Sequence, residues 1–235
     1  MKKAILMLAI IGLTSVCANL FAQTVSTGKV WTMYLESSTP PEYGGVNYYR
    51  ESLLQGDTII DNMKYIQCYE RTRAENEELF NDWKAKNVYY CQQDGKIYQK
   101  SGNSKPRVTI DYSLQVGDSI KGDLFQYIVT AVSDTVFASS TDKTPRKCLY
   151  ITDKWRMIIE DVWVEGIGSL TYGLEGLAVM EMAGFRRSLE KCQEGDKILY
   201  QRKMQNSSPY DLDGDGVLTL NDITTLINVY LEMSR

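Results

Sequence analysis

Short runs of β-branched and aromatic residues alternate with turn residues along most of the chain. Such runs occupy residues 30–34, 65–69, 88–91 and 127–130. Residues of this kind favour half-buried strands, and repeated short runs separated by turns are typical of antiparallel sheets. The pattern over residues 23–203 therefore predicts a mainly β fold, an antiparallel β domain built as a sandwich or as a barrel-like meander.

Three turn signals predict hairpins inside this domain. Asp61-Asn62 separates the runs 56–60 and 64–66, Gly122-Asp123 separates 117–120 and 126–128, and Asp94-Gly95 separates 89–91 and 97–98. Asp, Asn and Gly adopt the backbone conformations of tight hairpin turns at low cost. Each signal predicts a strand, a tight turn and a returning strand.

Residues 73–86 interrupt the β pattern. They are rich in Glu, Ala, Leu and Lys, and Leu79, Phe80 and Trp83 recur at helical spacing. The segment therefore predicts one internal helix with an apolar face against the sheet. The glycines of residues 161–176 lack the spacing of a dinucleotide loop, so a bend with close backbone approach is favoured over a ligand cradle.

The first 22 residues predict a signal peptide. Lys2 and Lys3 precede an apolar run over residues 4–13, and Ala22-Gln23 is the expected cleavage point. Cys17 offers an alternative, processing as a lipoprotein. Either route predicts an exported protein that is secreted, periplasmic or on the cell surface. No later stretch is apolar for long enough to predict a transmembrane segment.

Composition excludes several classes of function. Loss of Lys2 and Lys3 with the leader leaves the chain six charges acidic, which argues against nucleic acid as a partner. The chain contains no histidine. Catalysis by Ser-His-Asp or Cys-His sets and zinc sites with histidine ligands are therefore excluded, whereas chemistry by paired carboxylates is not.

Four cysteines follow the leader: Cys68, Cys91, Cys148 and Cys192. Export permits disulfide bonds among them, and buried free cysteines that act as small hydrophobic residues are equally compatible with the sequence. Their spacings are wide and no Cys-x-x-Cys is present, so neither a metal site nor a redox motif is predicted.

Residues 211–222 have the spacing of a calcium-binding loop. Carboxylates stand at positions 1, 3, 5 and 12, glycine at 6, and a backbone carbonyl at 7. Calcium takes six to eight oxygen ligands, and glycine at position 6 permits the sharp bend around the ion. The predicted Ca²⁺ ligands are Asp211, Asp213, Asp215, Val217 and Asp222.

A helix is predicted directly after this loop, because apolar residues recur with helical period over residues 223–231. Pro209 and the polar linker 204–208 exclude a helix of any length before it. A loop followed by one helix, closed by Asp222 at position 12, resembles one repeat of a dockerin. The chain shows one repeat where dockerins pair two, and Leu220-Asn221 replaces the Ser/Thr pair that often contacts the partner.

The dockerin resemblance covers residues 211–231 of a predicted calcium-binding module at 209–235, and it implies calcium binding together with a cohesin-like or other cell-surface protein partner. The remainder is similar to a group of secreted Bacteroidetes proteins of unknown activity. The motifs that carry this similarity lie at residues 56–65, 94–98, 111–118, 163–169 and 189–200. It implies export, a β fold and a modular C-terminus, and it brings no activity.

Two functions follow as hypotheses. The first is a secreted non-catalytic calcium-binding protein, with a β domain for recognition or scaffolding and a C-terminal interaction module. The second is a protein that binds or cleaves polysaccharide. Aromatic rings suitable for stacking on a glycan are Trp155, Trp163, Tyr48, Tyr49, Tyr89 and Tyr90, and the acids near the glycine-rich bend are Glu160, Asp161, Glu165 and Glu175.

Overall fold

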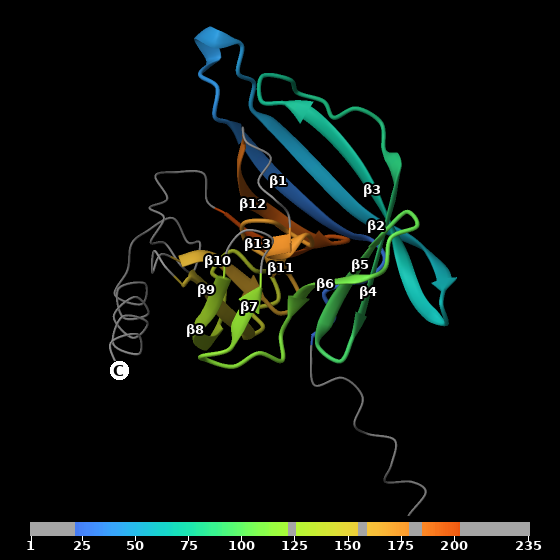
Figure 1. Ribbon diagram of the computed structural model, residues 1–235. Coiled ribbons are helices and arrows are strands. Elements are labelled where there is room, and N and C mark those ends of the chain that lie inside the picture. Colours follow the sequence, from blue (N-terminus) through green and yellow to red (C-terminus); the bar gives the residue numbers. More distant parts are fainter. Residues whose placement is uncertain (1–21, 122–125, 155–158, 179–184, 203–235) are drawn as a thin grey trace, which may run out of the picture.

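The computed structural model describes residues 22–121, 126–154, 159–178 and 185–202. In these ranges the chain forms two antiparallel sheets that share one hydrophobic core (Figure 1). The mainly β, antiparallel fold predicted from the sequence is confirmed for this part of the chain.

The larger sheet has eight strands in the order β13-β12-β1-β2-β3-β4-β5-β6. Its strands are β1 (Lys29–Ser37), β2 (Tyr48–Ile60), β3 (Met63–Ala74), β4 (Lys84–Gln93), β5 (Lys96–Ser101), β6 (Arg107–Asp111), β12 (Phe185–Glu194) and β13 (Lys197–Gln201). A 3₁₀ turn, η1 (Pro41–Tyr43), lies between β1 and β2. Because β1 pairs with both β2 and β12, the two ends of the described domain meet inside one sheet.

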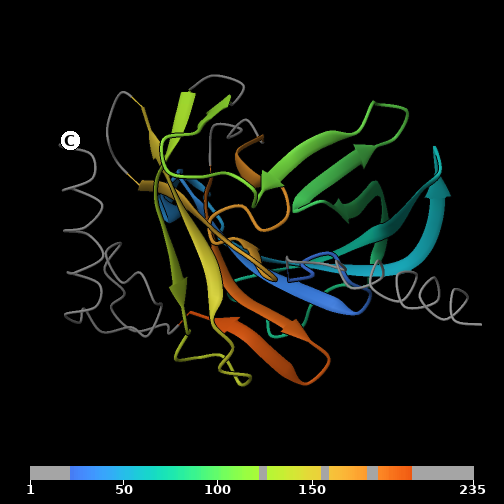
Figure 2. The ribbon, with the colours of Figure 1, turned by 90° about the horizontal axis from the view of Figure 1, so that it is seen from below.

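The smaller sheet has five strands in the order β11-β10-β9-β8-β7. Its strands are β7 (Ser119–Lys121), β8 (Gln126–Thr135), β9 (Arg146–Asp153), β10 (Ile159–Val164) and β11 (Gly168–Ser169), and a second 3₁₀ turn, η2 (Gly176–Ala178), follows. Figure 2 shows this sheet beside β12 and β13, on the side away from the β2–β3 hairpin. Every residue of β9 except Lys147 is buried, so this strand is covered on both faces.

The core lies between the two sheets. Trp31 and Met33 of β1 point into it from the larger sheet, and Leu149 and Ile151 of β9 contribute from the smaller one. All four side chains are at most 2 % exposed. Burial of such apolar surface is the main force that holds two sheets together.

Two of the predicted hairpins are observed with their turns. Asp61 and Asn62 join β2 to β3, and Asp94 and Gly95 join β4 to β5. All four residues have positive φ angles, from 50° to 75°, as a two-residue turn between twisted strands requires. The third hairpin is present as β7 and β8, although its predicted turn lies outside the described residues.

The predicted internal helix at residues 73–86 is wrong. The first two of these residues belong to β3 and the last three to β4, so only residues 75–83 connect the strands. Leu79 is 82 % exposed instead of packing on the sheet. Phe80 and Trp83 lie over the guanidinium group of Arg71, at 4.8 and 4.4 Å from Cζ to the ring centroids. Strand pairing and these contacts override the local helix propensity.

The glycine-rich stretch 161–176 forms a bend with close backbone approach, as predicted. Gly168 has a φ of 118°, and a Cβ atom there would lie 2.7 Å from the carbonyl oxygen of Gly173. Only glycine permits this contact. The bend leads the chain from β10 and β11 of the smaller sheet to the segment 172–175.

The predicted C-terminal loop–helix lies outside the described residues. Among the residues described, no helix has the length and hydrophobicity needed to cross a membrane.

Candidate functional site

The five predicted calcium ligands, from Asp211 to Asp222, fall in the part of the chain that the structure leaves undescribed. Within residues 22–202, apart from the undescribed gaps, no group of three or more acidic or cysteine side chains could hold a metal ion. The sequence motif therefore remains the sole support for a metal site.

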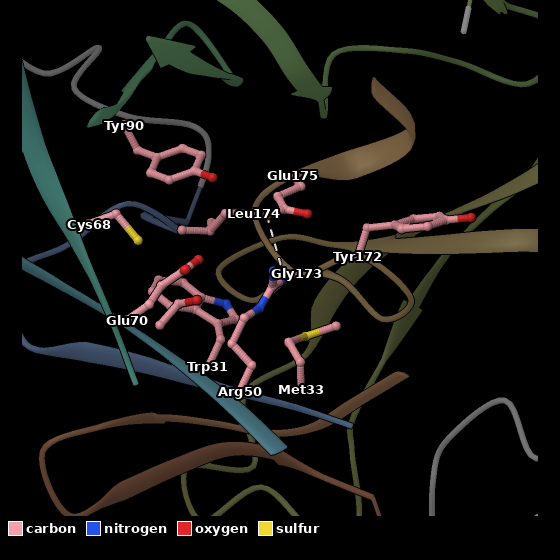
Figure 3. A pocket seen from close by; sticks show the side chains of 11 residues that line it. Trp31, Met33, Arg50, Cys68, Glu70, Tyr90, Tyr172, Gly173, Leu174 and Glu175 are labelled. Carbon is pink, nitrogen blue, oxygen red and sulfur yellow. Dashed lines mark ion pairs between the residues drawn. The ribbon is translucent and has the colours of Figure 1, made fainter. Parts of the chain in front are cut away.

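A small pocket opens between strands β1–β4 and the segment 172–175 (Figure 3). Its polar walls carry Arg50, Cys68, Glu70, Tyr90 and Glu175. The free space suffices for about one water molecule. Figure 3 shows Glu175 reaching from its loop toward Arg50, so the charged groups of the loop and of the sheet meet here.

Two arginines share one carboxylate at this pocket. Arg50 Nη2 lies 3.5 Å from Glu175 Oε1, and Arg187 Nη1 donates to Glu175 Oε2 at 2.8 Å. The side chains are only 12–20 % exposed. The Nε atoms of both arginines are buried without a hydrogen-bond partner. Glu70 lies in the same pocket, and with Glu175 it favours the charged form of Arg50.

The nucleophiles that line the pocket are not activated. Burial raises the pKa of the Cys68 thiol to about 12 and raises the pKa of the Tyr90 hydroxyl well above its usual value. Both groups stay protonated at neutral pH, and a thiol in that form is a poor nucleophile. Nothing in this pocket supports covalent catalysis.

Asp161, one of the acids considered for glycan cleavage, is a structural group. Its carboxylate accepts hydrogen bonds from Trp163 Nε1 at 2.8 Å, from Ser169 Oγ at 2.6 Å and from the Thr171 amide at 3.2 Å. The residue is 2 % exposed. Burial raises its pKa to about 6, and these hydrogen bonds act in the opposite direction.

Two other acids near the bend, Glu165 and Glu175, are also occupied. Glu165 accepts a hydrogen bond from the Ala22 amide at 2.7 Å, and Glu175 pairs with the two arginines. The side chain of Glu160 lies outside the described set. Asp161, Glu165 and Glu175 are therefore each held by groups of the protein itself.

Three of the six aromatic residues considered for glycan stacking lie inside the fold. Trp163, Tyr49 and Tyr90 are 2 %, 8 % and 3 % exposed. Tyr48 is 36 % exposed, and Tyr89 is half-buried. Trp155 lies outside the described residues. Rings that are covered in this way pack the core and cannot lie flat on a sugar.

The sequence pattern did not reveal an alternating stack of arginines and rings on β1, β2, β3 and the β3–β4 connection, which we name the arginine–aromatic ladder. Its members, in order, are Tyr34, Tyr49, Arg73, Phe80, Arg71 and Trp83. Arg73 Cζ lies 4.1 Å from the Tyr49 ring centroid and 5.2 Å from that of Phe80. The signal was the pair Arg71 and Arg73, two residues apart on one face of a strand.

The four cysteines after the leader are all buried and form no disulfide bond: Cys68, Cys91, Cys148 and Cys192. The sequence left open either disulfide bonds or buried free cysteines. The structure has buried free cysteines, which act as small hydrophobic residues.

Comparison with known proteins adds no relative. No protein-family model matches the chain, and neither a curated protein nor a solved structure is similar to it. The dockerin-like spacing of residues 211–222 therefore rests on the sequence alone.

Proposed function

We propose that this chain is an exported, non-catalytic calcium-binding protein in which the β domain serves recognition or scaffolding and the C-terminal loop–helix docks a protein partner. One observation carries the proposal: carboxylates at positions 1, 3, 5 and 12 of residues 211–222, with glycine at 6. This spacing suits one Ca²⁺ ion held by Asp211, Asp213, Asp215, Val217 and Asp222.

The described β domain supports a non-catalytic role. Asp161, Glu165 and Glu175 are each bound by groups of the protein itself. Cys68 and Tyr90, which line the pocket, have raised pKa values. These acids are thus engaged within the domain and the pocket's thiol and hydroxyl stay protonated, which suits a β domain that serves recognition or scaffolding.

Affinity capture tests this function. Residues 23–235 serve as bait for envelope and medium extracts, with calcium and then with a chelator, beside an Asp211→Ala bait. We expect a cohesin-like or other surface protein that is retained with calcium, released by the chelator and absent from the variant bait.

Capture that survives both the chelator and Asp211→Ala would contradict the docking role of the loop and assign recognition to the β domain. The alternative function, binding or cleavage of polysaccharide, is tested by incubating the protein with a panel of polysaccharides. Retention or cleavage of a glycan would replace the proposal by a glycan-directed one.

A further inference from the structure

Two residues of the segment before β1 are built into the interior of the domain, whereas Ala22 and Gln23 at its start are exposed. Thr24 and Val25 are 0 % and 1 % exposed, although they precede the first strand. Residues at the edge of a domain are poorly ordered unless specific contacts hold them. The burial of this segment therefore requires a partner for each of its backbone groups.

Gln92 of β4 supplies three of these partners. Its Oε1 accepts from the amides of Thr24 and Val25 at 2.6 and 3.1 Å, and its Nε2 donates to the carbonyl oxygen of Ala22 at 3.0 Å. One side-chain amide thus replaces the strand neighbour that this segment lacks.

The turn between β10 and β11 holds the same segment from the other side. The Gly166 amide donates to Thr24 Oγ1 at 2.9 Å, and that hydroxyl lies 3.1 Å from the hydroxyl of Tyr112. Tyr112 donates its own proton to the carbonyl oxygen of Val164 at 3.0 Å, so it accepts from Thr24. The chain of hydrogen bonds fixes the threonine side chain completely.

The buried side chain of Lys29 also holds the segment before β1. Lys29 Nζ donates to the carbonyl oxygens of Gln23 and Gly166 at 2.8 and 3.1 Å. Gly166 has a φ of 80°, and a Cβ atom there would lie 2.5 Å from Arg146 Nη1 and 3.4 Å from the Ala22 Cβ. The glycine is therefore needed for the close approach of the segment. We name Lys29, Gln92, Tyr112, Glu165 and Gly166 the N-terminal socket.

The acid of the socket faces the position where cleavage is expected. Glu165 Oε1 accepts from the Ala22 amide at 2.7 Å. The nitrogen of Gln23 is the next one along the backbone, within about 3.5 Å of that amide. Burial raises the pKa of Glu165, and the Ala22 amide and the cations Lys147 and Arg146 lower it. A positive charge at this place would stabilise the ionised carboxylate further.

We propose that the N-terminal socket is a binding site for the processed N-terminus, in which Glu165 pairs with the α-ammonium group of Gln23. A signal peptidase hydrolyses the Ala22–Gln23 bond with one water molecule. The leader departs with a carboxylate on Ala22, and Gln23 gains a protonated amine. Removal of the leader thus replaces the Ala22 amide hydrogen bond to Glu165 by an ion pair, and it also removes the hydrogen bond from Gln92 Nε2 to the Ala22 carbonyl oxygen. The inference rests on the proposed export of the chain and is independent of the calcium loop.

The test compares two forms of the chain in two backgrounds. One form begins at Gln23, the other retains two extra residues before Ala22, and each is made with Glu165 and with Glu165→Gln. We expect the processed wild type to melt about 2–4 °C above its extended form. In Glu165→Gln this difference disappears, because no carboxylate remains to bind the ammonium group. Asp57→Asn, an exposed acid on the far hairpin, is the matched control and retains the full difference.

An equal difference in wild type and Glu165→Gln would overturn the proposal, as would an extended form as stable as the processed one. Intact mass of the exported protein provides a second arm. A chain that begins at Gln23 supports the socket, whereas a lipidated chain that begins at Cys17 contradicts it.

If Glu165→Gln does not fold, the difference in stability between the processed and the extended wild type is measured over a range of pH instead. An ion pair raises the pKa of an α-amino group above its unfolded value of about 8. The stability it contributes is therefore present below that pH and is lost as the pH rises through the folded value. Charged or titratable groups that face the site are Lys29, Tyr112, Asp134, Arg146 and Lys147. Both forms contain them, so their titration cancels in the difference. A difference that stays constant up to pH 10 or so would contradict the ion pair.

Discussion

Two acidic regions of this chain differ in where their carboxylates find partners. In the β domain, Asp161 is held by N–H and O–H donors and Glu175 by two arginines. In residues 211–222, four aspartates occur within twelve positions that include no lysine or arginine. Like charges so close together repel unless a cation joins them. The acids of the β domain thus complete the fold, whereas those of the loop need a partner from outside, which we propose is calcium.

The largest effect is expected from removal of Asp161, an acid that is 2 % exposed. Asp161→Ala leaves Trp163 Nε1 and Ser169 Oγ without their acceptor, and the Thr171 amide keeps only its hydrogen bond to Ser169 Oγ at 3.1 Å. Each unsatisfied buried group costs about 1–3 kcal/mol, so we expect a loss on the order of 4 kcal/mol in the free energy of unfolding. Denaturation in urea measures it.

Asp57→Ala is the matched control for that variant. Asp57 pairs with Lys64 at 2.6 Å, but the two side chains are 47 % and 68 % exposed. Exposed pairs contribute at most about 1 kcal/mol. If the two substitutions were equally costly, the buried acid would not be part of the fold's support, and the contrast with the loop would fail.

Asp161 also predicts a pH dependence. Its pKa is about 6 in the folded protein and 3.8 in its ordinary state, so the folded state binds more protons between these values. The stability it contributes is present below about pH 4 and falls as the pH rises through about 6, by about 3 kcal/mol in total. The stability of wild type relative to Asp161→Asn should therefore decrease over this range. An increase would mean that the hydrogen bonds hold the carboxylate ionised.

A smaller effect is expected at the pocket. Glu175→Gln leaves Arg50 and Arg187 without their shared counter-charge, and we expect a loss of about 2 kcal/mol in unfolding free energy. Glu70→Gln is the control, because this acid lines the same pocket but pairs with the half-exposed Lys86 at 3.2 Å. It should cost less than about 1 kcal/mol. Equal costs would show that the arginine pair does not depend on Glu175.

The smallest effect concerns the arginine–aromatic ladder, where the partners of the cations are rings instead of acids. Phe80→Ala removes a ring that lies between Arg71 and Arg73, and we expect a loss of about 1 kcal/mol. Leu79→Ala, at an exposed position, should change stability by less than about 0.5 kcal/mol. Thermal melts measure both. The opposite order of effects would restore the helical interpretation of this segment.

The hairpins could be predicted because their determinants are local. Asp61-Asn62 and Asp94-Gly95 adopt the positive φ angles of a tight turn wherever they occur between strands. The segment 73–86 could not be predicted in this way. Its composition favours a helix, but Phe80 and Trp83 bind arginines that strand pairing aligns on β3, and a local pattern does not contain that information.

The N-terminal socket could not be predicted for the same reason. The segment that contains Ala22 and Thr24 meets Gln92 across 68 positions and Glu165 across 143 positions of sequence. The calcium loop is the opposite case, since all its predicted ligands lie within twelve residues. Sites that one short segment builds can be found by spacing, and sites that the whole fold assembles cannot.

Calorimetric titration of residues 23–235 with calcium is the most direct test of the contrast between the two acidic regions. We predict one Ca²⁺ ion per chain, with a dissociation constant of about 10⁻³ M or lower, and loss of binding in Asp211→Ala. Asp57→Ala should bind as wild type does. Absence of binding at millimolar calcium, or equal binding by Asp211→Ala, would contradict a calcium site in the loop.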